Sequence, residues 1–209
     1  MNLSLGEVEA MARKAARGAG YSWGLADEAG FATRWLEARG QGGITALALW
    51  LAQAAEQDIT RLAPRDLKSW TSAEGHLCPL LTGAALSDAA GLVPDTGLML
   101  PSVKWPLLLL PFTAHLAKTR GRVVRLDAEG GSAEVSRDAL SLVGDWTMAE
   151  SPLSVEFIDS TIEPGSRQTR AQPDTAAWTT LNRLAARTYA PATEASRLRG
   201  AGAGLTDND

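Results

Sequence analysis

The sequence is poor in the side chains that build disulfide frameworks and metal sites. Its 209 residues include one cysteine and two histidines. A single cysteine excludes an internal disulfide and a zinc site made of several cysteines, which is the usual condition of a protein in a reducing compartment. We therefore expect a cytoplasmic protein with no metal site of this kind, and the sequence leaves the cofactor unknown.

A surplus of positive charge is also missing. Lysine and arginine total 20 against 24 aspartates and glutamates, so the formal net charge is -4. The basic residues are scattered along the chain, whereas nucleic-acid binding depends on clustered cations that neutralise phosphates. The charge pattern therefore predicts that nucleic acid is not a partner.

Long apolar runs are absent as well. The two most apolar stretches, 44–55 and 98–116, are too short or too interrupted by proline and lysine to cross a bilayer as a helix. The first residues also lack the basic and apolar regions of a secretory signal. We expect a soluble protein with no membrane partner, and the oligomeric state stays unknown.

What is present predicts an α+β fold that begins with helices. Ser4 and Glu7 form a capping box before a helix that ends at Gly18. Ser22 begins a second helix, which a run of glycines stops, so that the two make a helical hairpin. Residues 44–57 are apolar on nearly all sides, as in a helix that is buried in a core.

The middle of the chain predicts loops and a small antiparallel sheet. Closely spaced prolines and glycines indicate loop-rich structure from residue 77 to residue 111. Residues 121–136 are typical of a β-hairpin with a glycine turn, and the alternating apolar residues of 153–157 predict a third strand.

The end of the chain predicts a polar linker, a C-terminal helix over 176–189 and a glycine-rich tail. Because helices and strands occur in separate blocks, the pattern favours α+β over a doubly wound sheet. We expect a single globular domain of residues 1–209. Its predicted parts are a helical segment 1–72, a loop-rich and β segment 73–160, a linker 160–175, and the helix and tail 176–209.

The same four residues, Arg-Gly-Ala-Gly, occur at 17–20 and again at 199–202. Glycine lets a backbone approach a ligand closely, arginine grips anions with a planar fork, and chain ends often lie near each other. We therefore consider one composite anion site, with Arg17 from the first copy and Arg197 and Arg199 beside the second. A basic tail that balances the terminal acids is the alternative.

Three further residues extend this hypothesis. Ser22 and the free N–H groups that begin the second helix suit an anion, and the alternative is a helix–helix turn that simply needs glycine. Trp23 lies in the same turn and lines either a pocket or the core. At the other end, Asp207 belongs to an Asp-Asn-Asp ending that offers oxygen ligands to Mg²⁺ or Ca²⁺, or forms a solvated acidic tail.

Glu28 is a candidate general acid or base. It shares a helix face with apolar residues four and seven positions on, and desolvation there would raise its pKa. The alternative is that acids in the first turn of a helix complement its dipole.

The segment 74–79 collects an acid, an imidazole and the only thiol of the chain. His76 and Cys78 point the same way in an extended segment, which suggests a base and a nucleophile. Alternatively, Cys78 is a small buried apolar residue. A zinc site would need these two residues, Glu74 and a fourth ligand, and His115 is the only other histidine.

Residues 13–30 and 196–209, with their two glycine-rich runs, resemble a bacterial protein family of unknown function. The resemblance extends over the whole chain. It implies no activity, cofactor or catalytic set, so a function has to be argued from the residues themselves.

These residues support three hypotheses. The first is an enzyme of lyase, isomerase or hydrolase type that acts on a small anionic metabolite at a site joining residues 17–28 and 196–209. The second is a non-catalytic ligand-binding or accessory subunit that docks on a partner protein. The third assigns both glycine-rich segments to packing alone.

Overall fold

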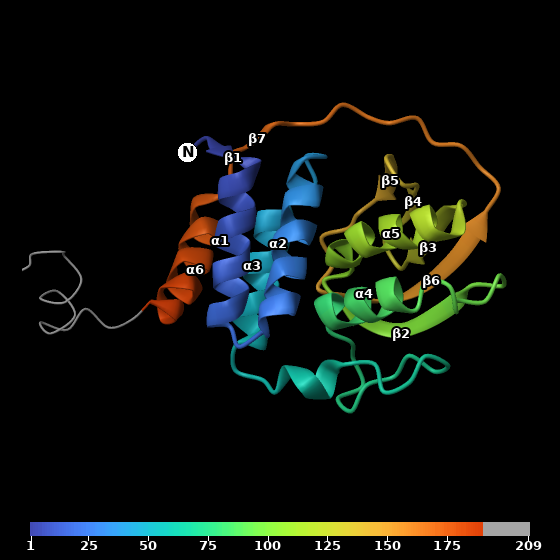
Figure 1. Cartoon of the computed structure of the whole chain (residues 1–209), viewed down its shortest axis with the longest axis horizontal. Coiled ribbons are helices and arrows are strands. Elements are labelled where there is room, and N and C mark those ends of the chain that lie inside the picture. Colours follow the sequence, from blue (N-terminus) through green and yellow to red (C-terminus); the bar gives the residue numbers. More distant parts are fainter. Residues whose placement is uncertain (190–209) are drawn as a thin grey trace, which may run out of the picture.

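The computed structural model describes residues 1–189 of the chain (Figure 1). Within this part it contains six α-helices, a five-stranded antiparallel sheet and a two-stranded sheet, so the α+β prediction is confirmed. The second Arg-Gly-Ala-Gly copy lies outside the described residues, as do Arg197, Arg199 and Asp207.

Four helices pack together and form one half of the molecule (Figure 1). They are α1 (Leu5–Gly18), α2 (Trp23–Glu37), α3 (Gly43–Ala54) and α6 (Thr175–Ala185). The predicted capping box is present at α1, where the Glu7 N–H donates to Ser4 Oγ at 3.2 Å. Gly18 lets α1 approach α6 closely, since a Cβ there would collide with the carbonyl group of Leu184. The helices predicted from Ser4, from Ser22 and over 44–57 are therefore confirmed.

The second half is a sheet with the strand order β2-β6-β3-β4-β5 and two helices packed on one face (Figure 1). Its strands are β2 (Leu98–Lys104), β3 (Val123–Ala128), β4 (Gly131–Val135), β5 (Leu140–Gly144) and β6 (Glu150–Ile158). The predicted hairpin is β3 with β4, and the predicted third strand is β6. In the register, Val124 faces both Val135 and Phe157, and all three side chains are buried under the helices.

The prediction of loop-rich structure over 77–111 is wrong. This stretch holds α4 (Pro79–Asp88), β2, the 3-10 helix η2 (Pro106–Leu109) and the start of α5 (Leu110–Arg120). Pro79 and Pro111 lie in the first turns of α4 and α5, where proline costs no hydrogen bond. Pro101 lies in an edge strand, beside an irregularity in its pairing. Gly83 is inside α4 because Phe112 of α5 occupies the space that a side chain would need.

A long connection returns from the sheet to the helical half, and we call residues 159–169 the strap. In Figure 1 it is the orange segment that passes from β6 over the top of the molecule to β7 (Arg170–Ala171). Its last residues are fixed, because the Gln168 N–H donates to the carbonyl of Ala38 at 2.8 Å. Strand β7 then pairs with β1 (Leu3–Ser4), which brings the end of the strap to the start of the chain.

The two halves share one hydrophobic core, and a buried hydrogen-bond chain crosses it. Trp50 Nε1 of α3 donates to the Tyr21 hydroxyl at 2.8 Å, and this hydroxyl lies 3.3 Å from the Cys78 sulfur at the start of α4. All three side chains are fully buried. This hydrogen-bond chain therefore joins the α1–α2 turn, α3 and α4.

None of the helices over residues 1–189 has the length and apolar character needed to cross a membrane.

We predict that Tyr21→Phe destabilises the protein, because the buried Trp50 N–H loses its only acceptor. An unsatisfied buried donor costs about 1–3 kcal/mol. Urea unfolding followed by tryptophan fluorescence measures the change, with Tyr189→Phe at an exposed position as the control. An unchanged unfolding midpoint in Tyr21→Phe would show that the hydrogen bonds from Trp50 through Tyr21 to Cys78 do not hold the helical half and the sheet half together.

Candidate functional site

Cys78 lies in the core. Its side chain is 0% exposed, and its sulfur accepts the Leu81 N–H at 3.4 Å as the N-cap of α4. Burial raises the pKa of the Cys78 thiol to about 11. A thiol is a nucleophile only as thiolate, so these surroundings favour a small buried residue over a catalytic one.

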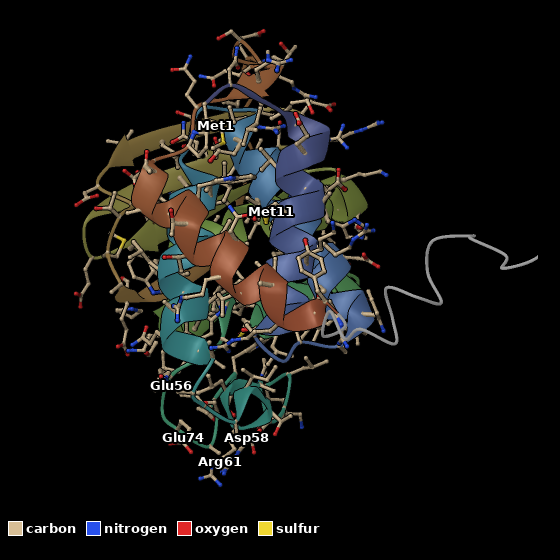
Figure 2. The ribbon with its side chains drawn as sticks, turned by 90° about the vertical axis from the view of Figure 1, so that its left-hand side faces the viewer. Met1, Met11, Glu56, Asp58, Arg61 and Glu74 are labelled. Carbon is tan, nitrogen blue, oxygen red and sulfur yellow. The ribbon has the colours of Figure 1, made fainter. Side chains whose placement is uncertain are left out.

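His76 and Glu74, the predicted neighbours of Cys78, serve other contacts. Figure 2 shows Glu74 and Arg61 together at the lower end of the molecule, where their side chains form an ion pair. The carbonyl of His76 accepts the Ser72 hydroxyl at 2.6 Å. A surface acid and a core thiol do not make one site. Over residues 1–189, no three His, Cys, Asp or Glu side chains are grouped so that they could hold a metal ion.

The first glycine turn also uses its polar groups internally. Arg17 donates to the carbonyl of Tyr21 and stacks over the Trp23 ring, with 4.5 Å between the guanidinium carbon and the ring centroid. Ser22 Oγ accepts the Leu25 N–H at 3.4 Å and so caps α2. Trp23 is 68% exposed, so it lies in neither the core nor a closed pocket. The other half of the composite site falls on residues beyond 189.

Glu28 is half-buried between helices. Burial raises its pKa, and the charge of Asp88 at the end of α4 raises it further, while His115 of α5 opposes the rise. Glu28 therefore has the perturbed pKa that desolvation predicts, and the charge of a histidine from another element acts on it. Such pairs are the usual sources of general acids and bases, provided that a ligand binds beside them.

The most charged hollow of the surface begins next to this pair. It lies between α2, α5, the turn 136–139 that joins β4 to β5, and the strap, and we call it the Asp138 groove. Its largest parts enclose about 340 Å³ and about 450 Å³ and share Lys118, Arg137 and Asp138. A small hollow of about 60 Å³ adjoins them and shares Arg39, Asp138 and Arg167.

Three arginines converge on Asp138. Arg39 and Arg167 both donate to its backbone carbonyl, at 3.3 Å and 3.1 Å. Its carboxylate lies 3.6 Å from the guanidinium groups of both Arg137 and Arg167. Lys118 lines the same hollow. The carboxylate pairs with two of these four cations, and Asp138 is the one acid among the residues that line this hollow, so this part of the groove carries excess positive charge.

The side chain of Arg39 is held in place before any ligand arrives. Its guanidinium carbon is 3.6 Å from the centroid of the Trp35 ring, and Nη1 donates to the Trp35 carbonyl at 3.2 Å. Burial lowers the pKa of Arg39 to about 10, and the positive charge of Arg167 adds to this effect. The lowered pKa means that the charged form is poorly solvated and repelled by its neighbour. An anion in the groove would relieve both effects.

A second large hollow, of about 700 Å³, lies beside Glu37, Gly42 and Arg170, and its two charged side chains already have partners within the protein. Glu37 Oε1 accepts the Ile44 N–H at 2.8 Å, which caps α3 in place of the side chain that Gly42 lacks. Arg170 donates to Asn2 at 2.9 Å and 3.0 Å. Because the Asp138 groove combines a hollow with an excess of cations, we take it as the candidate site.

Sequence reasoning missed the cations of this groove. Arg39, Lys118, Arg137 and Arg167 are distributed over the chain and form no motif, so only the fold brings them together. Of the residues singled out in the sequence, Glu28 and His115 lie closest to the groove, since His115 lines it.

Comparison with known proteins finds a family model that matches part of the chain, and no activity. Residues 3–76 match the model of a family described as a protein of unknown function (DUF3726). The resemblance inferred from the sequence, to a family of unknown function, is thereby confirmed for this segment, which includes α1, α2 and α3. No curated protein and no solved structure matches the chain. Of the residues that line the groove, Phe31, Trp35, Arg39 and Gln41 lie inside the matched segment, and the others lie outside it.

We predict that two substitutions shift the pKa of Glu28 in opposite directions. Asp88→Asn removes a negative charge and lowers this pKa, whereas His115→Ala removes the opposing positive charge and raises it. NMR titration of the Glu28 side-chain carboxyl between pH 3 and pH 8 measures both. Equal titration curves in the two variants and the parent protein would show that the three side chains do not interact.

Proposed function

We propose that the protein binds a small organic anion in the Asp138 groove. The observation that carries this proposal is the convergence of Arg39, Arg137 and Arg167 on one aspartate, with Lys118 beside them. Most charged clusters on protein surfaces balance their charges, and a cluster that does not is suited to a ligand of opposite sign. The hollow of about 340 Å³ is within the range of small-molecule sites.

The arrangement offers both fixed and movable donors. Arg39 is fixed by stacking on Trp35, so its binding geometry costs little entropy. The side chains of Arg137 and Arg167 are 69% and 52% exposed and can turn towards a ligand. A carboxylate or phosphate group would accept paired N–H donors from these guanidinium groups, the geometry in which arginine binds anions most strongly.

A catalytic role is the second candidate function, and the Glu28–His115 pair favours it. His115 lines the groove, and Glu28 behind it has a raised pKa. An anion held by the arginines would place its carbon skeleton near these two groups, which could move a proton as in a lyase, isomerase or hydrolase. In this candidate function Glu28 is still the acid or base of an enzyme, and the anion binds in the Asp138 groove, which lies within residues 1–189. A non-catalytic subunit would use the same cations for binding alone.

We also propose that the protein acts in the cytoplasm. The chain has one cysteine, and its thiol is buried in the core, which suits a reducing compartment without requiring one.

We predict that Arg137→Ala and Arg167→Ala each weaken anion binding by about tenfold or more, since a hydrogen bond to a charged group contributes about 1.5–3 kcal/mol. Calorimetric titration with acetate, propionate, succinate and inorganic phosphate measures the effect. Arg183→Ala on α6, whose residues do not line the groove, is the matched control. Unfolding curves of each variant separate lost binding from lost stability. Failure of every anion to bind the parent protein would refute the proposal.

We predict for the catalytic candidate that Glu28→Gln abolishes turnover of a bound anion while its dissociation constant changes less than threefold. Glutamine keeps the shape and loses the titrating group. Glu9→Gln on the exposed side of α1 is the control. Full turnover by Glu28→Gln would leave binding as the function and exclude this residue as acid or base.

A further inference from the structure

We infer that the anion bound in the Asp138 groove carries an aromatic ring, so that the ligand class is an aryl-substituted small carboxylate. This inference rests on the proposed function and concerns the end of the same groove that lacks charge.

Apolar residues and cations together line the hollow between α2 and α5. Phe31 and Trp35 lie four residues apart on one face of α2, and Arg39 follows four residues later, just beyond the end of the helix. On α5, Pro111 and Ala114 precede Lys118 along the same wall. The same hollow is thus lined by apolar residues and by one cation from each of these two segments.

Arg39 and Lys118 lie in the charged part of this hollow. Arg39, from just beyond α2, and Lys118, from the last turn of α5, line one hollow with Arg137, Asp138 and Arg167. At a rise of about 1.5 Å per residue, Phe31 lies roughly 6 Å along α2 from Trp35, on whose ring the Arg39 guanidinium stacks. A ligand that contacts both the cations and Phe31 therefore needs an anionic group and an apolar group a few bonds away from it. Inorganic phosphate has no such apolar group.

Phe31 is the residue that we expect the apolar part of the ligand to contact. It is 42% exposed although phenylalanine is among the residues most often buried, and it forms the open side of a wall whose other members, Trp35, Pro111 and Ala114, are buried. An aromatic ring laid against Phe31 would remove apolar surface from water on both partners and gain ring–ring contact. His115 lies in the same hollow, between the apolar wall and the cations along α5.

The test uses calorimetric titration of the full chain with four probes: propionate, 3-phenylpropionate, its saturated analogue 3-cyclohexylpropionate, and inorganic phosphate. We expect 3-phenylpropionate to bind at least about tenfold more tightly than propionate, because the ring adds buried apolar area. The cyclohexyl compound should bind more weakly than the phenyl compound. Equal affinity for these two would overturn the aromatic assignment.

Two variants locate the contact. Phe31→Ala should remove the advantage of 3-phenylpropionate and leave propionate binding unchanged, whereas Phe31→Leu keeps apolar volume and should restore part of it. Leu49→Ala, at an exposed apolar residue of α3 away from the groove, is the control and should change nothing. A phenyl advantage that survives in Phe31→Ala would overturn the inference.

The outcomes for this inference and for the proposed function are distinguishable. If propionate and phosphate bind and Arg137→Ala weakens both, but the phenyl ring adds no affinity, the groove is an anion site and the aromatic inference is wrong. If no probe binds the parent protein, or if Arg137→Ala leaves all four affinities unchanged, the proposed function itself is wrong.

Discussion

The buried hydrogen-bond chain from Trp50 through Tyr21 to Cys78 is the constraint on which the candidate site depends. It fixes the start of α4 against α3 and the α1–α2 turn. Helix α4 in turn fixes α5, because Phe112 packs where Gly83 has no side chain. Since α2 and α5 are two walls of the Asp138 groove, a shift of α4 would change the width of the groove. A core contact far from any ligand thus sets the geometry of the surface that would bind it.

The Asp138 groove has more cations than acids, in contrast to the ion pairs elsewhere on the surface. Several arginines elsewhere have one acidic partner each, as Arg34 has Glu9 and Arg61 has Glu74. At Asp138 the cations outnumber the acid, and Arg39 is partly desolvated as well. Such an arrangement costs stability unless something offsets it, and natural proteins keep costs of this kind mostly at functional sites. Part of the offset is visible in the stacking of Arg39 on Trp35.

Local signals in the sequence predicted the elements that depend on local physics. Ser4 and Ser22 cap helices as their positions indicate, and the glycine turn before β4 forms the hairpin. Proline misled the prediction over 77–111, because its cost depends on the position within an element, and Pro79 and Pro111 occupy tolerated ones. Strand β5 carries little signal, being five residues long at the edge of the sheet.

The candidate site was not predictable in the same way. Glu28 was identifiable because its apolar neighbours recur at helical spacing, and desolvation then follows from the fold. The arginines carry no such pattern: Arg39 follows a helix, Arg137 lies in a turn and Arg167 in the strap. Their convergence depends on how the strap runs back from β6, which no local periodicity encodes.

The position of the groove explains why neither half of the molecule would contain it alone. Trp35 and Arg39 come from the helical half, Lys118 and Arg137 from the half built on the sheet, and Arg167 from the strap that joins them. Small-molecule sites are common where two packed units meet, because the seam provides a hollow that neither surface has. Here the bond from Gln168 to Ala38 holds the strap directly beside Arg39. A ligand that bridges Arg39, Arg137 and Arg167 would therefore connect all three parts, and its binding energy would stabilise their packing as well as the complex.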